Sequence, residues 1–326
     1  MMLITSRAFL LLNLLSTWPM GRLVVSAFDA ALLHRAASVR ATMMPHDLPP
    51  PNPLPKDLFF PSSFVQSDQK INETRVVKRR GFCNWIIPGR IMVGQYPGQN
   101  PEVDGPSSTE VKAHLTTLLK DANVKMFVSL QSEIPPQDDY QRWREQRGQV
   151  YLPDLTSRLQ FPRPFVHYAP IVESILSQSN HDSTTSTSSS HQHVRQCQYL
   201  HWPIEDLSIP ENSQSLNELL LRILTALDEH QQDEDGTAAA PAAVYIHCWG
   251  GRGRVGLTAS CLLSLLFPEL DAPTILGWIQ AGYDTREGAE NMPTALSKSP
   301  QTESQRQFVR NFVKQRRKKQ HLQQTK

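Results

Sequence analysis

The sequence of 326 residues lacks several features that would assign it to a familiar class. Its formal net charge is only +2, so it has no basic excess of the kind that binds nucleic acid. Its four cysteines contain no Cys-x-x-Cys pair, which argues against a disulfide framework and against a zinc site. No glycine-rich loop ends in Gly-Lys-Ser/Thr, which excludes a Walker-type nucleotide site. We therefore expect no metal, no cofactor and no nucleic-acid partner.

The chain also lacks a membrane-spanning run at its N-terminus. The apolar core at residues 8–15 is too short to cross a bilayer and is typical of a signal peptide, with small residues favouring cleavage after Ala27. Residues 28–44 carry two arginines and one acid, like a transit peptide. We interpret residues 1–44 as a targeting leader outside the fold. It resembles the bipartite leader of plastid proteins in algae with secondary plastids; a mitochondrial leader or plain secretion are the alternatives.

Composition then divides the remainder of the chain. A proline-rich stretch makes residues 45–81 a linker, since it cannot form a helix or a central strand. A folded domain is expected over residues 82–316, with a Ser/Thr-rich insertion near 156–195 and a basic tail at 317–326. No span is expected in the mature chain.

Apolar patterns within the domain alternate between strand and helix. A capping-box-like Ser/Thr-x-x-Glu starts the first helical pattern. This alternation predicts an α/β fold with a central, mainly parallel sheet flanked by helices. Strands are expected at 82–88, 90–98, 124–130, 197–204 and 243–248, and helices within 107–124 and at 215–230, 255–266, 273–281 and 302–314.

The stretch "AVYIHCWGGRGRVGLTA" places a thiol between a buried strand and a helix. A thiol is a poor nucleophile while it is protonated. Cys248 precedes a helix that begins near Arg254, and the positive end of that helix, with Arg252 nearby, favours the thiolate.

The loop itself is built to hold an anion. Gly250, Gly251 and Gly253 let successive backbone N–H groups point inward as a cradle. Arg254 adds a planar fork that holds two oxygens at once. The stretch therefore predicts a tetrahedral oxyanion beside a nucleophilic sulfur.

His247-Cys248, five residues and then Arg254 resemble the HCX5R signature of the cysteine-dependent protein tyrosine phosphatases. The glycine spacing is similar to that of their dual-specificity-like branch. "HWPIEDLSIP" resembles the acid loop of that family, and Asp206, followed by Pro210, fits the general acid better than its neighbour Glu205.

The resemblance implies roles for further positions. Cys248, Arg254 and Asp206 would be catalytic. Substrate binding is implied for His247, Trp249, Gly250, Gly251, Arg252, Gly253 and Gln305, the last in the place of a glutamine that helps to position water.

The expected activity is hydrolysis of a phosphomonoester, such as a phosphorylated protein, through a phosphocysteine. The family usually has Ser or Thr directly after the loop arginine, whereas here it is Val255, and Thr258 lies one turn later. Loss of that hydroxyl is expected to slow release of the phosphate. The alternatives are a phosphate-binding module of the same fold with little turnover, and a sulfur-transfer enzyme, which the motif spacing disfavours.

Overall fold

The computed structural model describes residues 21–42, 82–102, 105–152, 161, 163–182, 196–229, 242–286, 289 and 293–324. The predicted signal core and the proline-rich linker lie outside these residues. The elements are α2 (Gly21–Ala41), β1 (Cys83–Ile87), β2 (Ile91–Gly94), α3 (Ser108–Lys120), β3 (Val124–Gln131), α4 (Tyr140–Glu145), β4 (Gln149–Val150), β5 (Phe165–Val166), α5 (Ala169–Asp182), β6 (Gln198–Ile204), α6 (Ser213–Glu229), β7 (Ala243–His247), α7 (Gly253–Leu266), α8 (Ala272–Asp284), the short 3-10 helix η4 (Thr294–Leu296) and α9 (Glu303–Gln324).

A five-stranded sheet in the order β1-β2-β7-β3-β6 forms the centre of the molecule. The first pair is antiparallel, and the strands from β2 to β6 are all parallel. Every residue of β7 is buried, as expected for a central parallel strand. The predicted α/β class with a mainly parallel sheet is confirmed.

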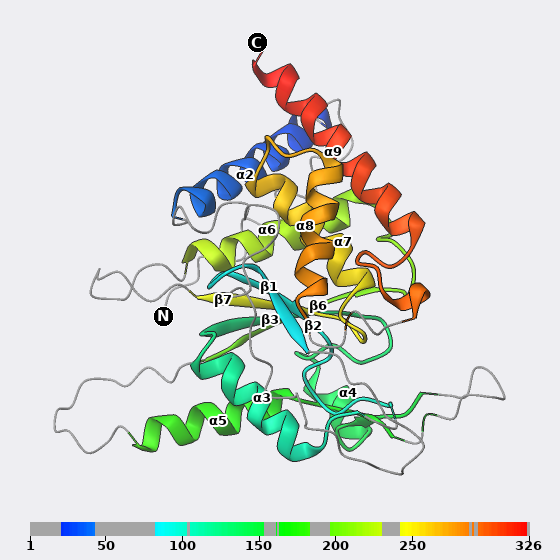
Figure 1. The fold of residues 1–326 in the computed structure, drawn as a ribbon. Helices are drawn as coiled ribbons and strands as arrows, with labels where there is room; N and C mark the ends of the chain where they lie inside the picture. The colour runs from blue at the N-terminus through cyan, green and yellow to red at the C-terminus, as the bar shows by residue number, and fades with distance from the viewer. Residues whose placement is uncertain are drawn as a thin grey trace, which may run out of the picture.

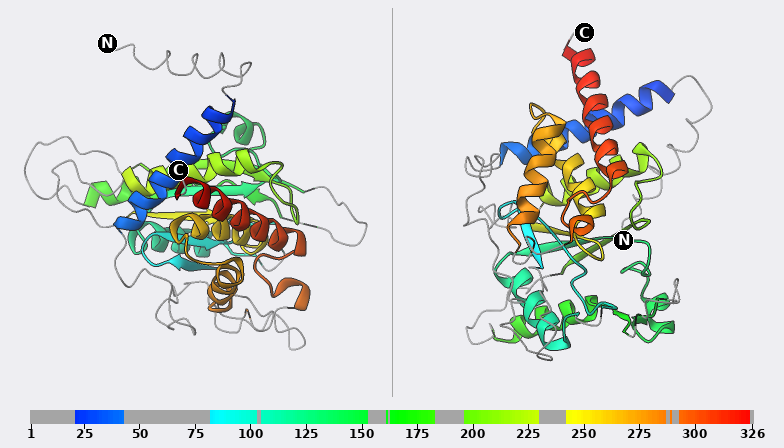
Figure 2. Two further views of the ribbon diagram at one scale, coloured as in Figure 1. Left: turned by 90° about the horizontal axis from the view of Figure 1, so that it is seen from above. Right: turned by 45° about the vertical axis from the view of Figure 1, so that its right-hand side comes forward.

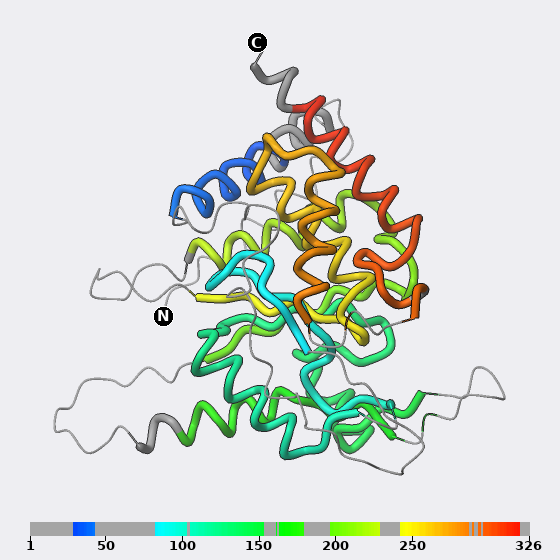
Figure 3. Tube along the Cα trace, viewed as in Figure 1, coloured from blue at the N-terminus to red at the C-terminus, as the bar shows by residue number. Residues whose placement is uncertain are grey.

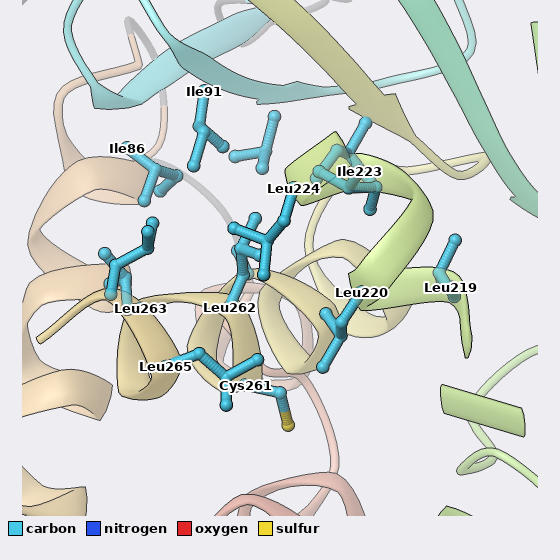
Figure 4. Packing of buried hydrophobic residues seen from close by; sticks show 14 of the residues in the cluster. Ile86, Ile91, Leu219, Leu220, Ile223, Leu224, Cys261, Leu262, Leu263 and Leu265 are labelled. Carbon is cyan, nitrogen blue, oxygen red and sulfur yellow. The ribbon is translucent and has the colours of Figure 1, made fainter. Parts of the chain in front are cut away.

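Helices cover both faces of this sheet (Figure 1). One face carries α6, α7, α8, α9 and α2, and the other carries α3 and α5. Figure 4 shows the packing on the first face, where Leu220 and Leu224 of α6 lie close to Leu262 of α7. All residues of α7 are buried, so this helix is held rigidly behind the loop that precedes it.

The helix α3, which covers the second face of the sheet, begins as its sequence predicts. Ser107 accepts from the backbone N–H of Glu110 and the Glu110 carboxylate accepts from the N–H of Ser107, which completes a capping box. Val111, Leu115 and Leu118 then face the sheet at helical spacing.

The helix α2 differs from the sequence interpretation, which set residues 28–44 apart from the fold. Leu32, Ala36 and Val39 belong to the main apolar core, and α2 lies along α6 (Figure 3). The composition misled because the two arginines that suggested a transit peptide serve as ion-pair partners. Arg35 and Ser38 contact Asp228, and Arg40 binds Glu269 through two bonds of 2.8 Å.

A second difference concerns the predicted insertion near 156–195. Its middle part forms β5 and the helix α5. Val172 and Ile175 of α5 are buried on the face of the sheet that α3 also covers. Within this region, residues 156–160, residue 162 and the Ser/Thr tract at 183–195 lie outside the described residues. The sequence interpretation missed α5 because the helix is followed directly by the low-complexity Ser/Thr tract.

The end of the chain differs too, because α9 continues past residue 316 as far as Gln324. The basic residues at 317–319 therefore belong to this helix rather than to a separate tail. Viewed from above, α2 and α9 lie near each other on the outside of the helical layer (Figure 2). Within the part of the chain described by the structure, no helix has the length and apolar character needed to cross a membrane.

Candidate active site

Three parallel strands bring their carboxyl ends to one edge of the sheet. There β7 ends at His247 and β6 ends at Ile204, while β3 between them ends at Gln131. In open α/β sheets this edge is the usual place for a ligand site. The residues that follow these strands therefore meet, although they are far apart in the sequence.

The loop after β7 needs glycine for steric reasons. Gly251 has a φ of +66°, and a Cβ there would come within 2.5 Å of the carbonyl carbon of Gly94 and 2.6 Å of the backbone nitrogen of Gln95. The Trp249 carbonyl accepts from the N–H of Tyr96 at 3.2 Å. The loop is thus pressed against the end of β2, and Gly250 lies in the same turn.

The start of α7 leaves its amides available to a ligand. Arg252 is the N-cap residue, and its side chain caps none of the first-turn N–H groups. Uncapped amides at a helix start form a site for an anion. This agrees with the cradle that the glycines predict.

Cys248 follows β7 directly and is 2% exposed. Its thiol shares a cluster with apolar side chains, yet it also lies within electrostatic range of Arg254. Burial alone lowers the pKa of Arg254, but the neighbouring Cys248, Glu133 and Asp206 outweigh it, so the pKa of this guanidinium is raised. Arg254 stays charged beside the sulfur.

Arg254 is 1% exposed and almost fully hydrogen-bonded. Glu133 takes both terminal nitrogens, with Nη1 to Oε2 at 2.7 Å and Nη2 to Oε1 at 2.9 Å. Nη1 also donates to the Ile204 carbonyl at 3.1 Å, and Nη2 lies 3.1 Å from Oδ1 of Asp206. Nε is the one nitrogen of this group without a partner among the described residues.

Asp206 stands on the turn that follows β6, with its side chain 55% exposed. Its position beside Arg254 distinguishes it from Glu205, whose side chain has no ion pair or hydrogen bond in the described part of the chain. A carboxyl group that is exposed and anchored at one oxygen can turn towards a leaving group. The role of Asp206 as general acid stays a prediction.

Gln305 lies at the start of α9 and is fully buried. Its Nε2 donates to the Ser208 carbonyl at 2.9 Å, and its Oε1 accepts from the N–H of Thr302 at 3.1 Å. A Cβ on Gly253 would lie 3.2 Å from the same amide. Gln305 therefore holds the acid loop, residues 205–210, against the start of α7, and its predicted contact with water stays a prediction.

Two of the predicted substrate-binding residues are occupied elsewhere. His247 is fully buried, and its Nε2 lies 2.8 Å from the Tyr168 hydroxyl. Burial, followed by His201 and Arg254, lowers the pKa of His247 well below its usual range, so the ring is neutral. Arg252 donates from Nε to Oε1 of Gln301 at 3.0 Å. His247 therefore anchors the start of the loop to Tyr168.

Trp249 forms an aromatic wall beside the loop. Its ring centroid lies 5.3 Å from that of Phe161 and 5.3 Å from that of Phe165, both edge-on. It therefore fixes one side of the loop through packing.

Glu133 is the residue of this site that sequence reasoning missed. Glu133 belongs to no motif of the loop. It comes two residues after the buried strand β3, which pairs with β7, the strand that directly precedes Cys248. A carboxylate in that place is a usable signal because parallel strands end at one edge. No group of three or more His, Cys, Asp or Glu in the described ranges is arranged to hold a metal ion.

A cysteine and an arginine six residues apart thus lie at the carboxyl edge of a mainly parallel sheet. Residues 171–309 match the family model described as "PTP-SAK: Swiss Army Knife protein, DSP-PTPase phosphatase domain". Residues 171–309 thus match a phosphatase domain of the dual-specificity type, in agreement with the resemblance seen in the sequence. No curated protein matches the chain.

Solved structures similar to this chain are phosphatases at low sequence identity. Tk-PTP in its active form shares 17% identity over 71% of this chain and 95% of that chain, with a TM-score of 0.38. PTPMT1 in complex with PI(5)P shares 12% over 73% and 99%, with a TM-score of 0.40. TbPTP1, a protein tyrosine phosphatase of Trypanosoma brucei, shares 15% over 93% and 96%, with a TM-score of 0.38.

Proposed function

We propose that the protein hydrolyses phosphomonoesters, with phosphorylated proteins among its substrates, through a phosphocysteine on Cys248. The observation that carries this proposal is the free edge of Arg254. Its Nε–H has no partner among the residues that the structure describes, and its Nη2 is shared with an exposed carboxylate that can leave. A phosphoryl group that takes both positions gains a bidentate, charge-assisted contact.

The pairing of Asp206 with Arg254 describes the site before substrate arrives. One carboxylate oxygen stands 3.1 Å from Nη2, where a phosphate oxygen would bind. Substrate would displace Asp206 and release it towards the leaving oxygen. Glu133 would keep its two bonds throughout, so the guanidinium would not need to reorient.

In the first step the Cys248 sulfur forms a bond to phosphorus, and the bond from phosphorus to the ester oxygen breaks. Asp206, once it has left Arg254 and taken up a proton from solvent, gives that proton to the leaving oxygen, which also takes the electron pair. Arg254 and the uncapped amides of α7 stabilise the charge on the equatorial oxygens.

In the second step a water oxygen bonds to phosphorus and gives its proton to Asp206, while the sulfur departs with the electron pair. Val255 is fully buried and offers no hydroxyl to that sulfur. We therefore expect the phosphocysteine to accumulate. If it were never hydrolysed, the protein would be the phosphate-binding module that is the alternative function.

The test is hydrolysis of a small aryl phosphate by the full chain, with vanadate as the inhibitor. Cys248→Ser should abolish the activity. Cys197→Ser is the matched control, since Cys197 is a buried cysteine on the far face of the sheet, and it should leave activity unchanged. Activity that survives Cys248→Ser would refute the phosphocysteine route. A burst of one equivalent with no later turnover would support the binding module instead.

A further inference from the structure

Two aliphatic side chains are exposed on the acid loop, residues 205–210. Leu207 is 50% exposed and Ile209 is 38% exposed. No other leucine, isoleucine, valine or methionine in the described part of the chain is exposed to this extent. Single exposed leucines are ordinary on protein surfaces, but here both exposed aliphatic side chains lie within three positions of Asp206. This concentration points to a contact with another molecule.

The backbone of the acid loop is held in place around Leu207. This residue has a φ of +60°, a left-handed conformation that is costly for a leucine. The Ser208 N–H closes the turn by donating to the Glu205 carbonyl at 3.1 Å. From the start of α9, Gln305 donates to the Ser208 carbonyl at 2.9 Å, and the Thr302 hydroxyl donates to the carbonyl of Leu207 at 3.4 Å. Asparagine or glycine would suit this backbone better, so the leucine does not serve the stability of the free protein.

The charges around the two aliphatic side chains are negative. Glu205 and Glu211 are exposed, one before and one after the pair, and neither side chain has an ion pair or hydrogen bond among the described residues. The sequence has no lysine or arginine at 196–221. The first two arginines of α9 are both bound to Glu303. An anionic lipid surface would therefore be repelled here, whereas a lysine or arginine on a protein segment would be attracted.

The acid loop is close enough to the candidate active site to touch the residues beside a bound phosphate. Leu207 directly follows Asp206, whose Oδ1 lies 3.1 Å from Nη2 of Arg254. Consecutive Cα atoms are about 3.8 Å apart, so the Cα of Ile209 lies at most about 11 Å from that of Asp206. An extended peptide advances about 3.3 Å per residue, so the nearest neighbours of a phosphorylated residue are within reach of both side chains.

We propose that the acid-loop face, formed by Glu205, Leu207, Ile209 and Glu211, binds a segment of a phosphorylated protein. That segment carries a large aliphatic residue next to the phosphorylated residue and a lysine or arginine beyond it. This inference rests on the proposed function, because it names the class of phosphoprotein that the site selects. The aliphatic residue would lie against Leu207 and Ile209, away from water, and the cation would pair with the two glutamates. Leu207 and Ile209 are thus specificity-determining residues.

The experiment compares three short phosphotyrosine peptides as substrates of the full chain. In the first peptide a leucine stands on each side of the phosphotyrosine, with a lysine beyond each leucine. The second replaces both leucines by serine, and the third replaces both lysines by glutamate. The symmetric design makes the result independent of the direction in which a peptide binds. We expect kcat/KM for the first peptide to exceed that for the second about tenfold.

The charge preference is expected to be smaller than the apolar one. The first peptide should exceed the third about fivefold in kcat/KM at low salt, since exposed charge pairs contribute little each. Raising the salt concentration should shrink this second ratio and leave the first ratio in place, because salt screens charges and does not weaken apolar contacts.

Pairs of variants with side chains of similar size assign the preference to the two residues. Leu207→Gln and Ile209→Thr introduce polar groups, and each should reduce the preference for leucine about threefold or more. Leu207→Met and Ile209→Val are the matched controls, which keep an apolar surface and should retain the preference. The readout is the ratio between two peptides on the same variant, so any change in general activity cancels.

Equal kcat/KM for the leucine and serine peptides would overturn the proposal, as would a preference that survives Leu207→Gln combined with Ile209→Thr. A preference for the glutamate peptide would also overturn it. Binding of the full chain to phosphatidylserine vesicles that is lost in Leu207→Gln would assign the loop to a lipid surface instead.

Failure of the proposed function has a different signature. The native chain would then hydrolyse neither the small aryl phosphate nor any of the three peptides. In that case fluorescence anisotropy gives the affinity of the full chain for the same peptides. A tenfold higher affinity for the leucine peptide than for the serine peptide would support the acid-loop face, and equal affinities would overturn it.

Discussion

Arg254 is the residue at which the charges of the candidate site converge. Glu133 holds both of its terminal nitrogens, and a bidentate carboxylate is the strongest way to fix a guanidinium plane. The plane in turn decides where Nε and the free side of Nη2 point. Glu133 is therefore a positioning residue, which acts on substrate through Arg254.

We predict that Glu133→Gln lowers kcat/KM about 10- to 100-fold, because the neutral amide holds Arg254 through one oxygen only, which corresponds to a loss of about 1.4–2.7 kcal/mol. Vanadate affinity should fall in parallel, and a purely structural role would not require that. Glu145→Gln, on the exposed surface of α4, is the control. Native vanadate affinity combined with a lower melting temperature would contradict the positioning role.

Val255 is the residue at which this chain departs from the motif of the family that its loop resembles. It is fully buried in the first turn of α7, directly after Arg254, which is the position where the sequence resemblance implies a hydroxyl that assists the departing sulfur. We predict that Val255→Thr speeds hydrolysis of the phosphocysteine about tenfold, the effect of one hydrogen bond of about 1.4 kcal/mol to the departing thiolate. Rapid-quench kinetics would show a smaller burst and a faster steady state. An unchanged steady-state rate would mean that release is limited elsewhere.

For single residues, the reacting groups could be predicted from the sequence, whereas the residues that position them could not. Cys248, the glycines and Arg254 are adjacent in the chain, so one motif reveals them all. Glu133 lies more than a hundred residues earlier, and its contact with Arg254 depends on strand order. Gln305 was found by resemblance, yet its bonds to Ser208 and Thr302 depend on how α9 packs.

The elements differ in how well the sequence predicts them. The strands β3, β6 and β7 and the helices α6 and α7 could be predicted well, since all of them carry strong apolar periodicity. The helices α2 and α5 could not, because one follows a signal-like segment and the other precedes a Ser/Thr tract. Both had the composition of segments that do not fold, and only tertiary packing shows their apolar stripes.

The docking of α2 can be tested with adjacent residues of the same kind. Ala36 is 1% exposed in the main core, whereas Ala37 is exposed. We predict that Ala36→Asp destabilises the protein by about 3 kcal/mol, since it buries an unpaired carboxylate, and that Ala37→Asp changes stability by less than about 0.5 kcal/mol. Urea unfolding measures both. Equal effects would show that α2 does not pack on α6.

This result also bears on the leader. Cleavage after Ala27 would leave every described core contact of α2 in place, whereas cleavage near residue 44 would remove Leu32, Ala36 and Val39 from the core. A targeting role for the residues before Phe28 and its destination stay predictions. N-terminal sequencing of the mature protein would decide between the two cleavage points.

For the whole molecule, buried histidines couple stability to pH. Burial lowers the pKa of His114 and His247 well below the usual value, and it lowers the pKa of His167 to about 4, against a small opposing effect of the Gln137 backbone. The unfolded chain binds protons on these rings below about pH 6.5 while the folded chain does not. Stability should therefore be complete above pH 6.5 and fall as the pH falls towards 4.

We predict that the melting temperature declines over this interval and that His167→Gln makes the decline shallower by the contribution of one proton. His167 stacks on Trp143 at 4.4 Å, so the substitution also lowers stability uniformly at every pH. Thermal unfolding of both proteins from about pH 8 to about pH 4 separates the two effects, because only proton linkage changes the slope. Parallel curves would contradict the linkage.

The meeting of α2 with α9 has a consequence for synthesis and folding. The first described helix packs on α6 and α7, and Asp29 from that helix binds Lys319 near the end of the chain. On the ribosome, the early helix must wait as an amphipathic segment with nothing to cover its apolar side until the later helices emerge. A chaperone that recognises exposed leucine-rich helices could bind α2 during this interval, which would close once α6 and α7 have emerged.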